Sequence, residues 1–531
     1  MGSGSLGTEA EMIEKLLSFD IAISKEVKLS KIFLVTGALI SMLWAGYFAI
    51  VILNMPHQLT YLEGAANVQT WFFLNRENPF SLENHPVGTN NYGFLYSLIT
   101  LPFATLFGNT LLVHRAVTLG FVTLSALLTF GIIFRIKKDH ALAAICSSFI
   151  VVSLMGQQGM GGISAYPSST GAFFYITAIL IPLAGSFSNR SLFVSILATL
   201  AGFYTKPYFL LSFVIVALYI FLFVSPKKGL LYGLFFFGFL FFSILFVKRI
   251  FPMYFIDVIW GNIFNTYSFF GHMLEQMWGL IVTFLPIIVL TAFILAEKWK
   301  NTTKEKISFT LSWDNPLVKN PPGYFLHSLL VSLIAFISVL GWHALNQFGY
   351  SYQLVLPLFF CWLFGEAIPR HRAGLFVAIV MIINLFSWER VALHPSYLIE
   401  KSSKEWSQMQ EHLQNAKSIF HPPLIATDII SLGMPPIDSG HTIMFYNIQK
   451  YPDSILSDIS YERARRDGYG FTTSINRRIE NHKYDLIITV KDKAAFFDYQ
   501  TLQQNYILVD EIKIEMNMGG VYTLQIWKPN P

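Results

Sequence analysis

Apolar stretches separated by short polar segments fill the first three quarters of the chain. A helix needs about 20 apolar residues to cross a hydrocarbon core roughly 30 Å thick, and most of these stretches approach that length. The pattern therefore predicts an α-helical polytopic membrane protein with about eleven spans. We place the spans at residues 30–53, 111–134, 140–156, 169–186, 190–204, 207–224, 229–247, 277–296, 325–342, 353–368 and 373–388.

A further apolar segment, residues 92–108, is short, is interrupted by Pro102 and ends in a Gly-Asn turn. If the N-terminus is cytoplasmic and this segment does not cross, all the basic clusters between spans face the cytoplasm, as the positive-inside rule requires. Those clusters are Arg135/Lys137/Lys138, Arg190, Lys227/Lys228, Lys298/Lys300/Lys304/Lys306 and Arg370/Arg372. We therefore predict that residues 92–108 lie along the membrane surface. The first long loop, residues 54–110, is then on the outer side.

The last quarter of the chain has a different pattern, because residues 389–531 carry nearly half of all charged side chains. An amphipathic helix is predicted over residues 403–420, with Ser402 or Ser403 as its cap. Three strand-like segments follow at residues 483–490, 505–516 and 521–527, and Gly519-Gly520 fits a hairpin turn between the last two. These features predict a small α/β domain.

The predicted organisation has three parts. Residues 1–29, which open with a Gly-Ser run typical of an expression linker, form a cytoplasmic N-terminal segment. Residues 30–388 form the transmembrane body, and residues 389–531 form the soluble extracytoplasmic α/β domain. The two cysteines, Cys146 and Cys361, lie inside apolar runs, which favours buried side chains over a disulfide or a metal site.

Composition supports the membrane assignment and narrows the function classes. Only 13% of the residues are charged, against about 25% in an ordinary soluble domain. Hydrophobic residues make up 53%, and the mean hydropathy is +0.50. The net charge of +5 is not gathered on one face, so no nucleic-acid partner is predicted. No spacing of His, Asp or Glu imposes a metal geometry, and no metal or other cofactor is predicted.

Glu63 is the leading catalytic candidate on the predicted outer side. It follows the first span, among apolar and small residues, in the sequence TYLEGAANVQ. A carboxylate removed from water at the membrane surface is suited to act as a general base. The alternative interpretation, an exposed acid in a loop, fits the residue taken alone.

Basic residues are informative on the outer side, where the positive-inside rule disfavours them. Those at outer span ends are Arg115, Lys206, Lys248 and Arg249. Cations at that level suit the binding of a lipid phosphate, although snorkelling to lipid headgroups also explains Lys248 and Arg249. Lys206 differs because Tyr204 and Tyr208 flank it, and such rings either stack on a sugar or anchor the span.

Other polar candidates lie in the remaining outer segments. The loop 251–275 is amphipathic and is predicted to lie along the outer surface, with Asp257 and His272 as its notable polar residues. An interfacial polar residue is the alternative interpretation of His272. Further candidates for the substrate pocket are Asn91, Tyr92, His343 and Tyr350, and His57 and His85 are weaker ones.

Taken in order, these features resemble the membrane glycosyltransferases called GT-C. The first loop has an acid soon after span one, an amphipathic helix, a polar stretch at residues 75–80, a Tyr-rich helix ending in LFG, and the Arg of LLVHRAVTLGF. YTKPYF at residues 204–209 and FGYSYQLVLPLF at residues 348–359 are similar to the starts of a middle and a late span in that superfamily. Its members include protein O-mannosyltransferases and the lipid A aminoarabinose transferase.

The resemblance implies an inverting transferase that moves a sugar from a polyprenyl-phosphate donor to an acceptor hydroxyl on a glycan, lipid or protein. The reaction would occur at the outer side of the cytoplasmic membrane. Glu63 would remove the acceptor proton, and Lys206 and Arg115, with Lys248 and Arg249, would balance the charge of the leaving phosphate. A lipid phosphate is already a good leaving group, so the scheme needs no metal.

Two other classes fit parts of the pattern. A transporter or lipid flippase also has many spans and a polar pocket, but tends to show matching halves and broken helices at mid-membrane. A polymerase or ligase acting on lipid-diphosphate glycans is expected to have a large loop between late spans in place of a C-terminal domain. We favour the glycosyltransferase.

Overall fold

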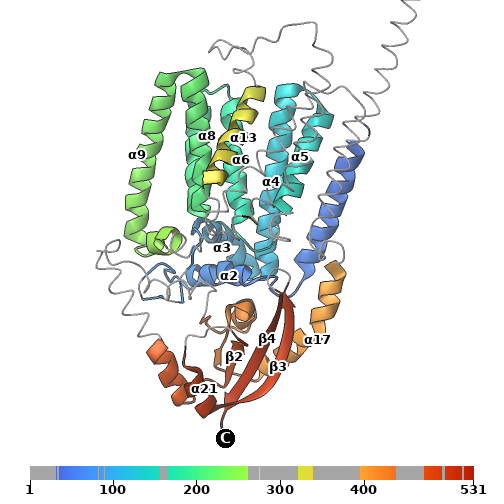
Figure 1. Cartoon of the computed structure of the whole chain (residues 1–531), viewed down its shortest axis with the longest axis vertical. Helices are drawn as coiled ribbons and strands as arrows, with labels where there is room; N and C mark the ends of the chain where they lie inside the picture. Colours follow the sequence, from blue (N-terminus) through green and yellow to red (C-terminus); the bar gives the residue numbers. More distant parts are fainter. Residues whose placement is uncertain are drawn as a thin grey trace, which may run out of the picture.

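The computed structural model describes residues 35–155 apart from 82, 86 and 89, residues 164–260, 321–338, 395–437, 472–492, 497–516 and 520–531, and the single residues 32 and 274. A bundle of helices forms one end of this structure and a β-sheet with its helices forms the other (Figure 1). Helices α2 and α3 lie between the two (Figure 1).

The helical body follows the apolar runs of the sequence. Its helices in chain order are Val35–Asn54, α4 (Leu111–Lys137), α5 (His140–Met155), α6 (Ser168–Ala184), α7 (Asn189–Thr205), α8 (Leu211–Tyr219) between the short turns η2 (Pro207–Leu210) and η3 (Ile220–Val224), α9 (Pro226–Ile250) and α13 (Pro321–Ser338). The short turn η4 (Ile256–Trp260) follows α9.

Polar caps set where several of these helices begin. The side chain of Thr110 accepts a hydrogen bond from the backbone N–H of Val113 at the start of α4. Ser188 caps α7 in the same way, and Ser225 caps α9 with Pro226 at its first position. These side chains satisfy N–H groups that have no partner within the helix, so the chain reverses direction at each cap without leaving them unpaired.

Among the described residues, four stretches of helix are long and apolar enough to cross a membrane: Val35–Asn54, Leu111–Lys137, Pro207–Val224 and Pro226–Ile250. All four coincide with predicted spans. The predicted spans at α5, α6, α7 and α13 form helices of 16 to 18 residues. The predicted spans at residues 277–296, 353–368 and 373–388 lie outside the described residues.

The first long loop forms α2 (Tyr61–Leu74) and α3 (Leu95–Phe107), which pack on each other. The apolar segment 92–108, which we did not count as a span, contains α3, and Pro102 lies inside this helix. Both helices lie across the end of the bundle that faces the sheet (Figure 1). Arg115 is at this end of α4, whereas Arg135 and Lys137 are in its last turn, at the other end.

The C-terminal part has a four-stranded sheet in the order β1-β2-β4-β3. β1 and β2 are parallel and the other neighbours are antiparallel. The apolar face of α17, with Trp406 and Met409, packs on inward residues of the sheet such as Ile488 and Ile526. The elements are α17 (Pro395–Gln414), β1 (Ile419–Phe420), η6 (Pro423–Ile425), α18 (Ala426–Ser431), β2 (Leu486–Val490), α21 (Tyr499–Asn505), β3 (Tyr506–Met516) and β4 (Gly520–Pro529).

One sequence-based prediction in this region is wrong. The helix expected over residues 403–420 begins earlier, at Pro395, and ends at Gln414, so neither Ser402 nor Ser403 is its cap. Ile419 and Phe420 instead form β1, because they align with Leu486 and Ile487 of β2 as a parallel pair. The strands β2 and β3 lie within two of the segments predicted as strands, and β4 extends slightly beyond the third at both ends.

Candidate functional site

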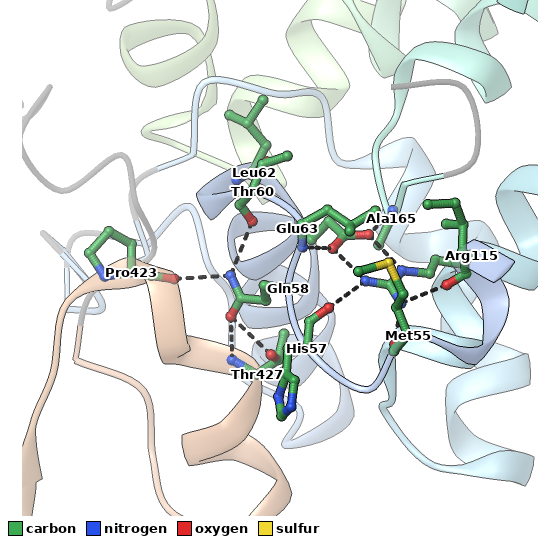
Figure 2. A network of polar contacts seen from close by, with 12 residues as sticks. Met55, His57, Gln58, Thr60, Leu62, Glu63, Arg115, Ala165, Pro423 and Thr427 are labelled. Atoms are coloured by element: carbon green, nitrogen blue, oxygen red, sulfur yellow. Dashed lines mark hydrogen bonds and ion pairs between the residues drawn. The ribbon is translucent and has the colours of Figure 1, made fainter. Parts of the chain in front are cut away.

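Glu63 lies in the first turn of α2 and is completely buried. Its Oε1 accepts hydrogen bonds from Arg115 Nε and the backbone N–H of Ala165, both at 2.8 Å. Its Oε2 accepts from Arg115 Nη2 at 2.8 Å and the backbone N–H of Leu59 at 2.7 Å (Figure 2). A carboxylate has about four lone-pair sites, so this one is fully used. The alternative of an exposed loop acid is excluded.

Arg115, in α4, is equally buried and equally occupied. Besides its two bonds to Glu63, Nη1 donates to the carbonyls of Ile52 and Met55, and Nη2 donates to that of His57 at 2.8 Å. A guanidinium has five N–H groups, and all five are engaged. The carbonyls belong to the end of the first helix and the residues after it, where backbone acceptors lack partners within the helix.

The Glu63–Arg115 pair therefore joins the end of the first helix, α2, α4 and residue 165 into one closed unit. A buried bidentate ion pair of this kind is tolerated in the fold only while both partners remain, because removal of either one leaves the other as an uncompensated buried charge. In this arrangement neither side chain has an atom left for a substrate. A phosphate contact of Arg115, which the sequence predicts, would need one of these hydrogen bonds to open.

Lys206 forms the second part of the site. Its side chain is buried, and Nζ lies 3.7 Å from the ring centre of Tyr166, 4.7 Å from that of Tyr92 and 5.7 Å from that of Tyr208. Nζ donates a hydrogen bond to Ser168 Oγ, at 2.8 Å. Among the residues that the structure describes, no carboxylate lies within ion-pair distance of this ammonium group.

Local sequence explains how Lys206 comes to this position. It caps the C-terminus of α7 in an extended conformation, and Pro207 starts the next turn. Gly93 donates its N–H to the carbonyl of Thr205 at 3.0 Å, and a Cβ at Gly93 would lie 1.8 Å from the carbonyl oxygen of Tyr204. Only glycine allows this close approach. It brings the neighbouring Tyr92 against the lysine.

The surroundings of Lys206 favour an anion. Burial lowers the pKa of this lysine well below its usual value, because desolvation penalises the charged form. Ser168 is the first residue of α6, a helix of 17 residues, so the positive end of its dipole lies beside the same ammonium group. A negatively charged ligand at this point would favour the charged form of Lys206 and meet the N–H groups at the start of the helix.

A third buried group joins the first loop to the segment after α9. His85 Nε2 lies 2.7 Å from Asp257 Oδ2, and Nδ1 lies 2.6 Å from the carbonyl oxygen of Ser81, to which it donates. Burial raises the pKa of Asp257, although His85 opposes that effect. Burial lowers the pKa of His85, but the charge and hydrogen bond of Asp257 outweigh it and the pKa is raised. The pair therefore holds a proton tightly.

The other predicted site residues divide into four groups. Tyr204 is turned away from Lys206, because its hydroxyl donates to Ser243 Oγ at 2.7 Å and its ring lies against Phe94. Lys248 and Arg249 are exposed in the last turn of α9, as snorkelling side chains would be. Asn91 is half-buried beside Tyr92. His272, His343 and Tyr350 lie outside the described residues.

Sequence reasoning missed Tyr166 and Ser168, which contact Lys206 directly. The available signal was the sequence AYPSST, an aromatic residue and a proline followed by hydroxyl residues at a helix start. Within the described ranges, no group of three His, Cys, Asp or Glu side chains could hold a metal ion.

The order of these elements gives a fold similar to that of a solved GT-C protein. ArnT from Cupriavidus metallidurans, solved bound to undecaprenyl phosphate, aligns with a TM-score of 0.51 and 12% identity over 92% of this chain and 97% of that chain. The apo structure of the same protein gives the same values. The predicted resemblance to GT-C is thus confirmed for the fold, and the apolar helices agree with a membrane protein.

A weaker similarity links the chain to the oligosaccharyltransferase of Archaeoglobus fulgidus, with a TM-score of 0.34 and 13% identity over 81% of this chain and 56% of that chain. A TM-score of this size does not establish a shared fold. No family model matches the chain, and no curated protein matches it in sequence.

Proposed function

We propose that this protein is a membrane glycosyltransferase that transfers a sugar from a polyprenyl-phosphate donor to an acceptor hydroxyl, with inversion at the sugar. The reaction takes place at the end of the bundle that carries α2, α3 and the C-terminal sheet. We place this end at the outer side of the cytoplasmic membrane, because more of the described basic residues at helix ends, such as Arg135, Lys137 and Lys227, lie at the opposite end.

The observation that carries the proposal is the environment of Lys206. A buried ammonium group is costly unless it is paired, and no described carboxylate pairs with it. Phosphate supplies the missing charge, and it develops further negative charge as the sugar leaves. Lys206 and the start of α6 are already in place to stabilise that charge, which is the form of assistance that lowers a transfer barrier most.

The rings around Lys206 suit the rest of such a donor. Tyr92 and Tyr166 meet edge to face, with ring centres 5.0 Å apart, and both contact the ammonium group. Aromatic faces of this kind bind the apolar face of a sugar ring as well as a cation. ArnT, which has a similar fold, was solved in complex with undecaprenyl phosphate, and this supports the same ligand class here.

Glu63 is the proposed general base, with a condition that its contacts impose. All its lone pairs are occupied, so one hydrogen bond must open before it can take a proton from an acceptor. Breaking the hydrogen bond from the backbone N–H of Leu59 or Ala165 costs less free energy than breaking those from Arg115, because the latter would leave a buried charge unpaired. We propose no phosphate role for Arg115, Lys248 or Arg249.

The test is binding of undecaprenyl phosphate to the purified protein in lipid nanodiscs. Loss of one charge-assisted contact costs about 1.5 to 3 kcal/mol, so Lys206→Ala should weaken binding by roughly ten- to a hundredfold. Lys227→Ala, an exposed lysine in the first turn of α9, is the matched control and should bind like wild type. Equal binding by Lys206→Ala and wild type would refute the phosphate site.

A further inference from the structure

The C-terminal part touches the helical body at the same short stretch that holds Glu63. Residues 57–72 contact Trp406 and the segment 423–430 through several different kinds of interaction. His57 stacks on Trp406 with ring centres 4.2 Å apart and an angle of 4° between the rings. Val68 and Phe72 of α2 pack on Ala426 and Ile430 of α18. The sheet end of the molecule therefore packs directly on α2. We call this interface, between residues 57–72 on one side and Trp406 with residues 423–430 on the other, the seat.

Gln58 forms the polar centre of this seat and is buried. Its Oε1 accepts hydrogen bonds from Thr427 N at 2.8 Å and Thr427 Oγ1 at 2.9 Å. Its Nε2 donates to the carbonyl of Pro423 at 3.1 Å and to that of Thr60 at 3.2 Å. One side chain thus ties η6 and the first turn of α18 to the N-cap of α2 (Figure 2).

The residues on either side of Gln58 belong to the Glu63–Arg115 unit. The carbonyl of His57 accepts from Arg115, and the N–H of Leu59 donates to Glu63. Thr60, whose carbonyl Gln58 also holds, caps the helix that carries Glu63. Any movement of Gln58 therefore acts on the two partners of the buried pair through one or two peptide units.

Gly64 makes the seat tight. A Cβ at this position would lie 2.9 Å from the carbonyl oxygen of Pro423, 2.7 Å from Gln58 Nε2 and 3.3 Å from the Cβ of Ala426. The first of these is a backbone atom that cannot turn aside. The C-terminal segment thus fits against α2 only because the helix has no side chain there, and a substitution at Gly64 offers a second way to disturb the seat.

We infer that Gln58 is a positioning residue, which transmits the seating of residues 423–427 to the Glu63–Arg115 pair and so sets whether that pair is closed. A seated C-terminal part keeps all four hydrogen bonds of Glu63 in place. A displaced one loosens Leu59 and frees an acceptor site on Oε2. The effect on transfer rests on the proposed function, in which Glu63 must lose one contact to act.

Hydrogen exchange at the backbone N–H of Ala165 tests the inference without any assay of activity. This amide donates to Glu63 and comes from a distant part of the chain, so its protection reports the position of the carboxylate. In the full-length protein in nanodiscs, Gln58→Ala and Gly64→Ala should each speed exchange in the peptide that contains Ala165. Thr427→Val, which keeps the backbone donor, should have a smaller effect.

Gln408→Ala is the matched control, because Gln408 donates to Asp510 within the C-terminal part, at 2.7 Å, and does not take part in the seat. It should leave exchange at Ala165 unchanged. Global unfolding would raise exchange throughout the bundle, so the amide of Ser195 in α7 serves as an internal reference. Unchanged exchange at Ala165 in both Gln58→Ala and Gly64→Ala would overturn the inference.

Turnover provides the functional arm. Gln58→Ala should raise kcat by about tenfold or more while binding of undecaprenyl phosphate stays as in wild type, because an acceptor site on Glu63 is freed and the Lys206 site is not touched. If the wild-type protein shows no transfer at all, the proposed function fails while the exchange result still stands. If exchange changes and kcat does not, the link from the seat to catalysis is wrong.

Discussion

Arg115 donates one hydrogen bond to each carboxylate oxygen of Glu63, and neither side chain is exposed to solvent. The two residues are far apart in sequence and come from α4 and α2. The same contact that fixes the first turn of α2 also satisfies the carbonyls that end the first helix. Substitutions at Glu63 will therefore report stability as well as chemistry.

The first prediction separates these two effects. Glu63→Gln puts an NH2 group against the donors of Arg115, Leu59 or Ala165, so it should lower the free energy of unfolding by about 3 to 5 kcal/mol. The double variant Glu63→Gln/Arg115→Met removes the stranded cation and should be more stable than Glu63→Gln alone. Thermal unfolding in detergent measures both. A Glu63→Gln variant as stable as wild type would contradict the closed pair.

The second prediction concerns the charge of Lys206. Because burial lowers its pKa, the lysine without ligand loses its proton at lower pH than an ordinary lysine, and an anion must then bind together with a proton. Above the second ionisation of phosphate near pH 6, binding of undecaprenyl phosphate should weaken as the pH rises through this lowered pKa, by up to about tenfold per unit and already below the range where an ordinary lysine titrates.

The Lys206→Arg variant is the control for that titration. A guanidinium stays charged throughout this range, so binding by the variant should be nearly independent of pH even if its geometry makes binding weaker. Equilibrium binding measured at several pH values in nanodiscs distinguishes the two proteins. Parallel pH profiles would show that Lys206 is not the titrating group.

The third prediction follows from His85 and Asp257. In the folded protein the pKa of His85 is raised above its unfolded value of about 6.5. The free energy of unfolding that this pair contributes is therefore fully present below about pH 6.5 and is lost as the pH rises through the raised pKa of the folded protein. The loss should not exceed about 1.4 kcal/mol per pH unit.

Asp257→Asn should change the sign of this dependence. Without the carboxylate, burial is the largest influence left on His85 and outweighs the Ser81 carbonyl and the charge of Glu83, so the pKa should be lowered and stability lost as the pH falls below about 6.5. Unfolding midpoints in denaturant from about pH 5 to pH 9 measure both slopes. The interpretation fails if the wild type and Asp257→Asn show the same slope.

The sequence could predict most of the helical architecture because the thickness of a bilayer fixes the length of a span, and capping residues such as Ser188 and Ser225 mark where spans begin. It could also place Glu63, Arg115 and Lys206 at one end of the molecule. The sequence could not predict the partners of Glu63 and Lys206, because Ala165, Tyr166 and Ser168 contact these two residues only in the folded chain.

Local patterns also favoured the wrong structure in two places. The amphipathic period of residues 403–420 continues to Phe420, but pairing with β2 makes Ile419 and Phe420 a strand. Lys206 has Tyr204 and Tyr208 as neighbours in sequence, yet the rings nearest its ammonium group belong to Tyr166 and Tyr92. In both cases a contact between distant segments outweighs the local signal, which is the usual limit of single-sequence reasoning.

The last prediction tests the side of the membrane on which the site lies. In a variant that lacks Cys146 and Cys361, single cysteines at Glu77 in the first loop and at Asn481 in the C-terminal part are exposed to solvent. Both should react with an impermeant thiol reagent added to intact cells. A cysteine at Lys227, exposed at the start of α9, lies at the opposite end of the bundle and should react only after the cells are opened. Labelling at Lys227 alone would put Glu63 and Lys206 in the cytosol, where an outward-facing lipid-linked donor could not reach them.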